Sequence, residues 1–269
     1  MSAAPPVTAL VLAASRSGSE DPVAAIGGKS HKCLVDVAGQ TMIERVIAAL
    51  LDSGACGQVL VSIESESILR QVPRLASWLD EGRVETTPSA ENLADSILSL
   101  ADKGSPPLPL LLTTADNVLH TPELIARFAR DALASGADVA VGMTPEATVR
   151  AEFPDEQLGF FRFRDGGYSF CNLFVFRTAK SFETAEAFRG GGQFRKKPWR
   201  ILKAFGVLNL LRFRFGRLTV SGAFERISRR FGLRLETIEV PYAFAPIDVD
   251  NPRTYALSER IIGGREAAG

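Results

Sequence analysis

Residues 9–14 read Ala-Leu-Val-Leu-Ala-Ala, an uninterrupted apolar run that is typical of a strand buried on both faces of a parallel sheet. A helical pattern of apolar residues follows over 42–51, and a second apolar strand follows over 58–63. The same alternation predicts helices over 94–101 and 122–133 and strands over 108–113 and 138–141. The chain is therefore predicted to have a Rossmann-like α/β fold, with a mostly parallel sheet and helices on both faces.

The last third of the chain has a different pattern. Strands are expected over 160–164, 173–177 and 234–240, and a closing helix over 252–262. Between them, residues 189–230 hold 12 basic residues and a single acid, Glu225. We expect one domain over 1–269, in which 189–230 is a basic helical insertion or lid. Three roles remain open for it: a cover over a substrate, a dimer contact, or a peripheral contact with an anionic membrane through 195–217.

Composition narrows the function. Basic and acidic residues both number 31, and this zero net charge gives no reason to expect a nucleic-acid partner. Cys33, Cys56 and Cys171 are far apart and odd in number, which is typical of free thiols in a reducing compartment. With only two histidines, a histidine metal cluster is excluded. The start of the chain lacks a secretory pattern and the apolar run over 7–14 is too short to span a bilayer, so we expect a cytoplasmic protein.

Parallel sheets bind ligands beyond the carboxyl ends of their strands, so function is expected in three loops, those after Ala14, Ile63 and Thr113. The first of these, over 13–32, is long for a connection between a strand and a helix and is rich in small residues. Its backbone N–H groups can surround phosphate oxygens, and its basic side chains, Arg16, Lys29 and Lys32, can neutralise their charge. The alternative is a mobile surface loop with scattered charge. It is not a Walker loop, because no Gly-Lys-Ser/Thr opens a helix in it.

Asp116 follows the most apolar strand of the chain, in Thr113-Thr114-Ala115-Asp116-Asn117. A carboxylate at this edge can bind Mg²⁺, which takes one or two carboxylates and completes its shell with phosphate and water. The alternative is that Asp116 or Asn117 caps the turn before the next helix. That helix has its own cap in Thr121, followed by Pro122, so Asp116 is left for a functional role.

A second carboxylate pair occurs in Ile247-Asp248-Val249-Asp250-Asn251-Pro252. Either residue of the pair can supply a further metal ligand. Asp250 or Asn251 is also placed to cap the closing helix, because Pro252 begins it. We expect Asp248 to be the better metal ligand and Asp250 to serve mainly the helix.

Taken together, these elements resemble the sugar-nucleotide and molybdopterin-guanine (MobA-like) nucleotidyltransferases, which have a glycosyltransferase-A-like fold. The family opens with a strand and L-A-A-G-x-G-x-R, and continues with K-x-L-x-x-x-x-G-x-x-M-I-x-R-V. This chain matches with Leu12-Ala13-Ala14 and then with Lys32, Leu34, Gly39, Met42, Ile43, Arg45 and Val46 at the same spacing. Thr-Ala-Asp116-Asn and Ile-Asp248-Val-Asp250-Asn-Pro resemble the family's metal-binding elements, and the resemblance extends from about residue 7 to residue 262.

The resemblance implies a nucleotidyl transfer that uses Mg²⁺. A phosphate oxygen of a small phosphorylated acceptor, such as a sugar, polyol or cofactor phosphate, would attack the α-phosphorus of a nucleoside triphosphate. Asp116 and Asp248, with Asp250 as a further candidate, would hold the metal, and Lys32 would offset the developing charge. Asn172 falls where many members hold the acceptor. The implied nucleotide-binding residues are Leu12, Ala13, Ala14, Ser15, Arg16, Ser17, Gly18, Lys29, Lys32, Glu91 and Ser96.

The phosphate loop departs from the family pattern. Ser15 and Ser17 stand where the family has two glycines, and Ser19 stands where it has an arginine. A catalytically silent nucleotide-binding module therefore remains an alternative. A glycosyltransferase of the same fold is the other alternative, although such enzymes usually carry D-x-D on a strand in the middle of the chain, where this sequence has Asp116 alone.

Overall fold

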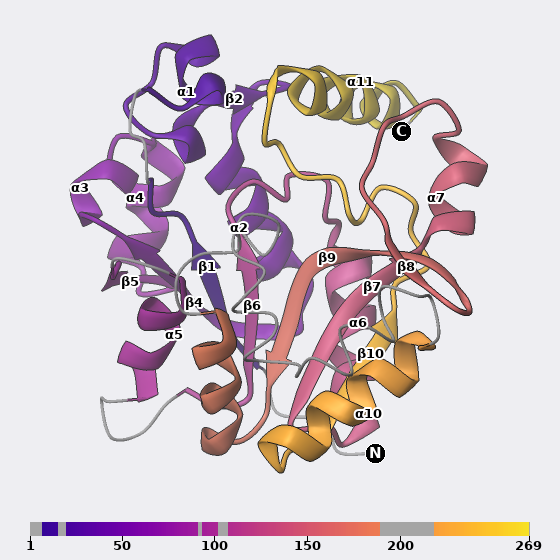
Figure 1. Cartoon of the computed structure of the whole chain (residues 1–269). Helices are drawn as coiled ribbons and strands as arrows, with labels where there is room; N and C mark the ends of the chain where they lie inside the picture. Colours follow the sequence, from indigo (N-terminus) through magenta and orange to yellow (C-terminus); the bar gives the residue numbers. More distant parts are fainter. Residues whose placement is uncertain (1–6, 16–19, 91–92, 102–106, 189–217, 269) are drawn as a thin grey trace. The chain divides into compact units, whose positions relative to one another are not determined.

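The structure is a computed structural model that describes residues 7–15, 20–90, 93–101, 107–188 and 218–268 (Figure 1). The chain divides into two compact units with interleaved segments. The first unit comprises Met1–Ser89, Leu112–Arg127 and Phe244–Gly269, and the second comprises Ala90–Leu111 and Phe128–Ala243.

The sheet of the first unit is parallel and apolar. Strand β1 (Val7–Leu12) pairs in parallel with β4 (Cys56–Ile63), and β4 pairs in parallel with β5 (Val84–Pro88). On the other side of β1 lies β6 (Leu110–Thr114). Three consecutive residues of β1, Ala9, Leu10 and Val11, are completely buried, as expected for a central strand covered on both faces.

Helices and one hairpin complete the first unit. Helix α2 (Met42–Asp52) is capped by Thr41 and packs an apolar stripe onto β4. A hairpin of β2 (Asp36–Val37) and β3 (Gln40–Thr41) precedes it. The other helical elements are α1 (Pro22–Gly27), η2 (Lys32–Leu34), α3 (Glu66–Leu69), α4 (Pro73–Asp80) and α11 (Pro252–Ala268).

The second unit has a mixed sheet. Strand β7 (Val139–Pro145) pairs in parallel with β10 (Leu235–Glu239) and antiparallel with β9 (Gly166–Phe176), and β8 (Phe161–Phe163) continues antiparallel to β9. Its helical elements are α5 (Leu93–Ala101), α7 (Glu146–Glu152), η3 (Ala179–Phe188) and α10 (Val220–Phe231). Helix α6 (Pro122–Ser135) begins in the first unit and ends in the second.

Strand β9 contains a bulge centred on Asn172. The register with β7 shifts between Val141 and Met143, so three residues of β9 oppose the single residue Gly142. Asn172 has a φ of 51°, in the left-handed region that is uncommon for residues other than glycine. Gly142 suits the close packing opposite the bulge, because a Cβ there would lie 3.2 Å from the Cβ of Leu173 and would require its neighbours to shift slightly. Because of the bulge, the partly buried side chain of Asn172 departs from the regular alternation of side chains along the strand.

The predicted α/β fold with a mostly parallel sheet and flanking helices is confirmed. The predicted central strands and helices agree with the structure to within a few residues. Strand β9 begins at Gly166, well before the strand expected over 173–177. The elements that were not predicted are β2, β3, β5, α1, η2, α3, α4, α7 and η3. Residues 189–217, which include the proposed membrane contact over 195–217, lie outside the described residues. The described end of the expected insertion forms α10.

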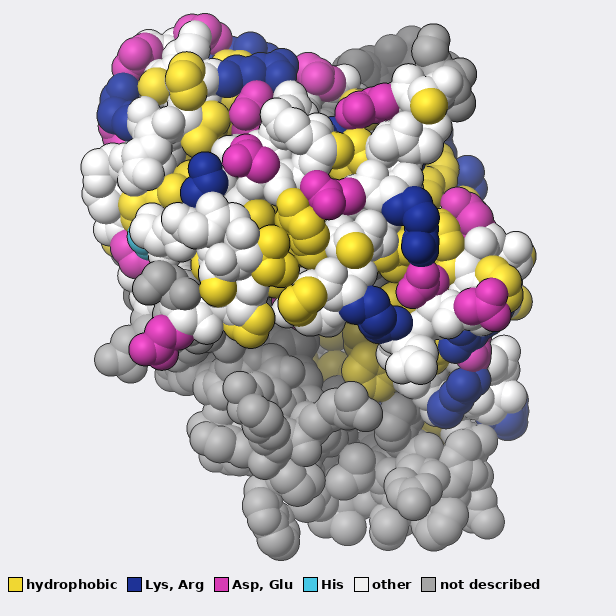
Figure 2. Space-filling model, turned by 90° about the horizontal axis from the view of Figure 1, so that it is seen from above, with side chains coloured by type: hydrophobic (Ala, Val, Ile, Leu, Met, Phe, Trp, Pro, Cys, Tyr) yellow, Lys and Arg dark blue, Asp and Glu magenta, His cyan; other side chains and the backbone are white. Residues whose placement is uncertain are grey.

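The described surface is mixed in charge. On the face drawn in Figure 2, acidic and basic side chains lie interspersed, as expected from the zero net charge. Within the described part of the chain, no helix is both long and apolar enough to cross a membrane.

Candidate active site

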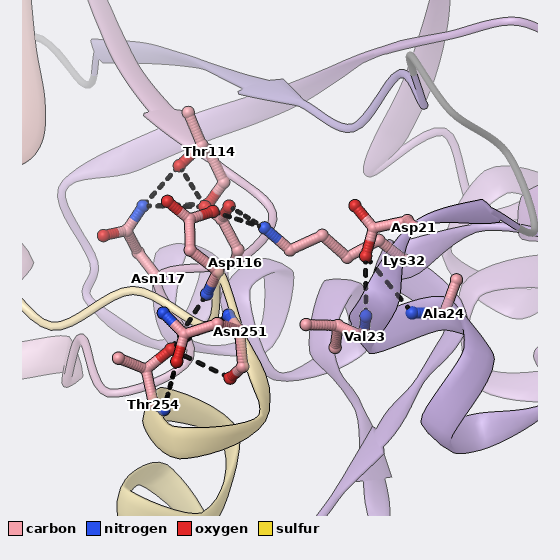
Figure 3. A network of polar contacts seen from close by, with 10 residues as sticks. Asp21, Val23, Ala24, Lys32, Thr114, Asp116, Asn117, Asn251 and Thr254 are labelled. Atoms are coloured by element: carbon pink, nitrogen blue, oxygen red, sulfur yellow. Dashed lines mark hydrogen bonds and ion pairs between the residues drawn. The ribbon is translucent and has the colours of Figure 1, made fainter.

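Lys32 is presented by a short turn that is anchored in the core. It opens the 3₁₀ helix η2, and the two residues that follow, Cys33 and Leu34, are buried. The N–H of Val35 donates to the Lys32 carbonyl at 3.1 Å and closes the turn. The backbone is therefore fixed, while the side chain, 18% exposed, extends toward the end of β6 (Figure 3).

Asp116 lies in a turn that orients its carboxylate. The Thr114 hydroxyl donates to Asp116 Oδ1 at 2.5 Å, and the Asn117 side-chain amide donates to the same oxygen at 3.3 Å. The Asn117 amide also donates to the Thr114 hydroxyl, which ties the three side chains together (Figure 3). The Asp116 carbonyl accepts the N–H of Val249 at 3.0 Å, which joins this turn to the segment before α11. These contacts hold Oδ1 and leave Oδ2 directed at Lys32.

Asp250 comes from that second segment, and it is not the helix cap. The cap of α11 is Asn251, whose side-chain oxygen accepts the N–H groups of Arg253 and Thr254, each at 3.1 Å. The hydroxyl of Thr254 in turn accepts the backbone N–H of Asp250 at 3.0 Å. The expectation that Asp250 serves mainly the helix is therefore wrong, because the residue directly before Pro252 takes that role.

The ammonium of Lys32 lies between the two carboxylates. Its Nζ is 2.6 Å from Asp116 Oδ2 and 2.7 Å from Asp250 Oδ1. Asp116 is 20% exposed and Asp250 is 62% exposed, so the cluster opens to solvent on the Asp250 side. Three charged groups from distant parts of the sequence thus meet at the carboxyl ends of β1 and β6, where the N–H of Ala115 donates to the Leu12 carbonyl at 3.0 Å.

The two carboxylates control the charge of Lys32. Burial acts to lower the pKa of the ammonium, but attraction and hydrogen bonds from Asp116 and Asp250 outweigh it and hold the pKa above its usual value. Lys32 is therefore positively charged throughout the physiological pH range. Its charge has two partners, the carboxylates of Asp116 and Asp250.

The donor set fits a Mg²⁺ ion shared with phosphate. Asp116 and Asp250 direct one oxygen each at a single cation, here the Lys32 ammonium. Among the residues that the structure describes, no group of three or more His, Cys, Asp or Glu side chains is placed to hold a metal alone. Mg²⁺ commonly uses one or two carboxylates and completes its octahedral shell with water and substrate phosphates, which is what two carboxylates at an open edge provide.

Asp248 lies two residues before Asp250 in the same segment. It lies between Ile247 and Val249, which are completely buried, and it is itself partly buried. The late carboxylate that contacts Lys32 is Asp250 rather than Asp248. The alternation of the segment places Asp248 and Asp250 on the same side. The sequence favoured Asp248 as the metal ligand, whereas the contact with Lys32 is made by Asp250.

A second polar cluster, around Glu64, was not predicted from the sequence. The N–H of Ser15, directly after β1, donates to Glu64 Oε1 at 2.7 Å. The other oxygen, Oε2, lies 3.9 Å from His31 Nε2, and His31 Nδ1 is hydrogen-bonded to the Ser30 hydroxyl at 2.9 Å. Glu64 is the first residue after β4, in one of the three loops where function was expected. Its position directly after a strand of the parallel sheet is the feature of the sequence that could have identified it.

Several matched motif residues build the scaffold that carries Lys32. Ala38 and Gly39 form the turn of the β2–β3 hairpin, with φ values of 49° and 78°. The motif glycine is therefore explained by the left-handed backbone conformation of this turn. The Arg45 guanidinium donates to the carbonyls of Val37 and Ala38, both at 3.0 Å, and fixes this turn against α2. The apolar motif residues Met42, Ile43 and Val46 are buried.

The remaining predicted nucleotide-binding residues are divided between the first unit, the second unit and the segments outside the described residues. In the first unit, Leu12 ends β1, Ala13 is buried, Ala14 is exposed, and Lys29 lies 3.5 Å from Asp36. In the second unit, Ser96 is buried and its hydroxyl accepts the N–H of Ala90 at 3.0 Å. Asn172 lies at the bulge of β9. Arg16, Ser17, Gly18 and Glu91 lie outside the described residues.

The fold is that of the nucleotidyltransferases. The structure is similar to a hypothetical transferase from Thermus thermophilus, with a TM-score of 0.73 and 23% identity over 93% of this chain and 99% of that chain. It is also similar to a CMP:2-keto-3-deoxy-manno-octonic acid synthetase complexed with CTP (TM-score 0.60, 14% identity, 96% and 99% covered). A third similar structure is a 4-diphosphocytidyl-2C-methyl-D-erythritol synthase from Anaerococcus prevotii (TM-score 0.56, 9% identity, 96% and 98% covered).

The sequence identifies the family within that fold. Residues 9–199, more than half of the chain, match the family described as the MobA-like NTP transferase domain. This chain belongs to that family. A comparison with curated proteins finds no match.

Proposed function

We propose that this protein transfers a nucleoside monophosphate from a nucleoside triphosphate to a phosphorylated small molecule and releases pyrophosphate. The observation that carries the proposal is the Lys32 ammonium between Asp116 and Asp250 at the carboxyl edge of a parallel sheet, in a member of an NTP transferase family. A cation beside two carboxylates suits a ligand that brings both phosphate charge and a metal ion.

The proposed step is an in-line displacement. An oxygen of the acceptor phosphate forms a bond to the α-phosphorus, the bond from the α-phosphorus to the bridging oxygen of the β-phosphate breaks, and pyrophosphate leaves. The attacking oxygen is already anionic, so no general base is required. The protein contributes position and charge: Lys32 lies ready to neutralise phosphate oxygens, and the Thr114 and Asn117 hydrogen bonds keep the Asp116 carboxylate oriented.

We also propose Mg²⁺ as the cofactor, held by Asp116 with Asp250, and with Asp248 still a candidate. When bound, it would polarise the α-phosphate and offset the charge that develops there. The support is the chemistry of the donor set, two carboxylates that converge on one positive charge.

Asn172 is our proposed acceptor contact. A residue other than glycine with a left-handed backbone costs conformational energy, and such residues occur preferentially at functional sites. The similar synthetase named for 2-keto-3-deoxy-manno-octonic acid suggests that sugar acids belong beside phosphorylated acceptors in any screen.

The test is a pyrophosphate-release assay. Purified protein with Mg²⁺ is mixed with each of ATP, GTP, CTP and UTP and with sugar phosphates, polyol phosphates and sugar acids, and a coupled pyrophosphatase reports turnover. We expect acceptor-dependent release with one triphosphate. Triphosphate binding without turnover on any acceptor would favour the silent module, and consumption of a preformed nucleotide sugar would favour the glycosyltransferase.

A further inference from the structure

The Lys32 side chain occupies the place where a metal ion held by Asp116 and Asp250 would lie. Its Nζ is at hydrogen-bonding distance from both carboxylates, 2.6 Å from Asp116 Oδ2 and 2.7 Å from Asp250 Oδ1. A Mg²⁺ bound to the same two oxygens would lie about 2.1 Å from each of them. Two cations that share these oxygens would be too close to remain without strong repulsion, so one excludes the other.

We propose that Lys32 is an internal counter-cation. Its ammonium occupies the metal-binding position between Asp116 and Asp250 until a bound triphosphate attracts the side chain away. The proposal rests on the proposed function, because it concerns how that site is loaded. It predicts that metal and triphosphate bind with positive coupling, each raising the affinity for the other.

The Asp116 carboxylate does not depend on Lys32 for its orientation. Asp116 Oδ1 is held by the Thr114 hydroxyl and the Asn117 amide, and its carbonyl is held by the N–H of Val249. The backbone of Asp250 is fixed through Thr254, within the capping turn of α11. Departure of the ammonium therefore leaves the Asp116 carboxylate oriented and the backbone of Asp250 in place.

Lys32 itself can move without disturbing the fold. Its backbone is anchored by η2 and by buried Cys33 and Leu34, whereas its ammonium ends a flexible four-carbon chain. The Asp250 side of the cluster is open to solvent, so an anionic ligand has access to the ammonium. The polyphosphate would replace both lost ion pairs with new ones.

The test measures metal binding directly, without turnover. Mn²⁺, which shares the preference of Mg²⁺ for oxygen ligands, is titrated into wild type and into Lys32→Met, and free Mn²⁺ is followed by electron paramagnetic resonance. Lys29→Met is the matched control, since it removes one positive charge nearby from a residue paired with Asp36 instead. We expect Lys32→Met to bind Mn²⁺ roughly tenfold more tightly or better, a coupling of ordinary size, and Lys29→Met to stay near wild type.

Equal or weaker Mn²⁺ binding by folded Lys32→Met would overturn the proposal, as would an equal gain in Lys29→Met. If Lys32→Met does not fold, the ¹⁵Nζ NMR signal of Lys32 in wild type decides, assigned by its loss in Lys32→Arg. It should be little changed by Mg²⁺ alone and should shift with Mg²⁺ plus tripolyphosphate. A shift with Mg²⁺ alone would contradict the proposal. The pyrophosphate assay tests the proposed function separately, so the two failures are distinguishable.

Discussion

The ammonium of Lys32 lies 2.6 Å from a carboxylate oxygen of Asp116, a residue 84 positions further along the chain. The pair joins the turn before the β2–β3 hairpin to the end of β6. Asp250 closes the cluster from the segment that leads into α11.

Removal of the Lys32 charge should impair both activity and stability. Lys32→Met is expected to lower the turnover rate by about a hundredfold or more, equivalent to about 3 kcal/mol of lost charge stabilisation. It also leaves two carboxylates facing each other without a cation, so the free energy of unfolding should fall by about 1–2 kcal/mol. This loss is smaller than for a fully buried ion pair, because Asp250 is largely exposed to solvent. Urea denaturation measures the second effect.

The double variant Lys32→Met/Asp250→Asn separates repulsion from lost packing. Removal of one carboxylate charge should restore part of the lost stability, although activity should not return. A double variant that is no more stable than Lys32→Met would mean that the ion pairs contribute little to stability. The loss of stability in Lys32→Met would then come from the aliphatic part of the Lys32 side chain.

Three polar residues in the segment before α11, Asp248, Asp250 and Asn251, should have different roles. Asp250→Ala is expected to reduce turnover, because it removes a carboxylate from the cluster, with a small effect on stability. Asn251→Ala should lower the free energy of unfolding by about 1 kcal/mol, since it removes the helix cap, and should affect turnover less. Asp248→Ala should reduce turnover less than Asp250→Ala does, because Asp250 is the carboxylate that contacts Lys32. Parallel rate and melting measurements give the ranking, and the opposite order would return Asp248 to the metal site.

The cysteines should be unreactive in the folded protein. Burial raises the pKa of Cys33 and of Cys171 to about 12 and that of Cys56 to about 11, against an ordinary value of 9.0. Labelling by a thiol reagent at pH 8 should therefore be slow for native protein and fast in urea. Fast labelling of native protein would contradict the burial of these side chains.

The same pKa shifts predict a stability loss in alkali. A thiol whose folded-state pKa is raised contributes stability below its unfolded pKa and loses it as the pH rises through the folded value. The thiols should therefore lower stability between about pH 9 and pH 12. A variant with all three cysteines replaced by alanine should show a shallower decline over this interval, and an equal slope would exclude the thiols as the cause.

Sequence patterns predicted the strands that carry the site because those strands are continuous apolar runs. Lys32 and Asp116 were found because both stand at strand ends or motif positions, and ends of parallel strands meet at one edge. The Thr121 cap was also predicted and is confirmed, since its hydroxyl accepts the N–H of Leu124. Strand β5 was missed because its short polar alternation, Val-Glu-Thr-Thr-Pro, resembles a loop.

Other contacts depend on tertiary structure. The choice between Asp248 and Asp250 depends on which carboxylate reaches Lys32, and no local pattern contains that information. Asn251 was one of two candidates for the cap, although Pro252 at the first helical position favours the residue directly before it. The hydrogen bond from Ser15 to Glu64 joins residues 49 positions apart, and an isolated glutamate after a strand is usually a solvated side chain.

The most direct test of this account is the effect of Asp116→Asn on pyrophosphate release. The substitution removes a charge while it keeps the shape of the side chain and an oxygen that can accept from Thr114. With the triphosphate and acceptor identified in the screen and with saturating Mg²⁺, we predict that turnover falls by a hundredfold or more, about 3 kcal/mol, while the melting transition shows a folded protein. An unchanged turnover rate would remove Asp116 from the metal site and would contradict the proposed active site as a whole.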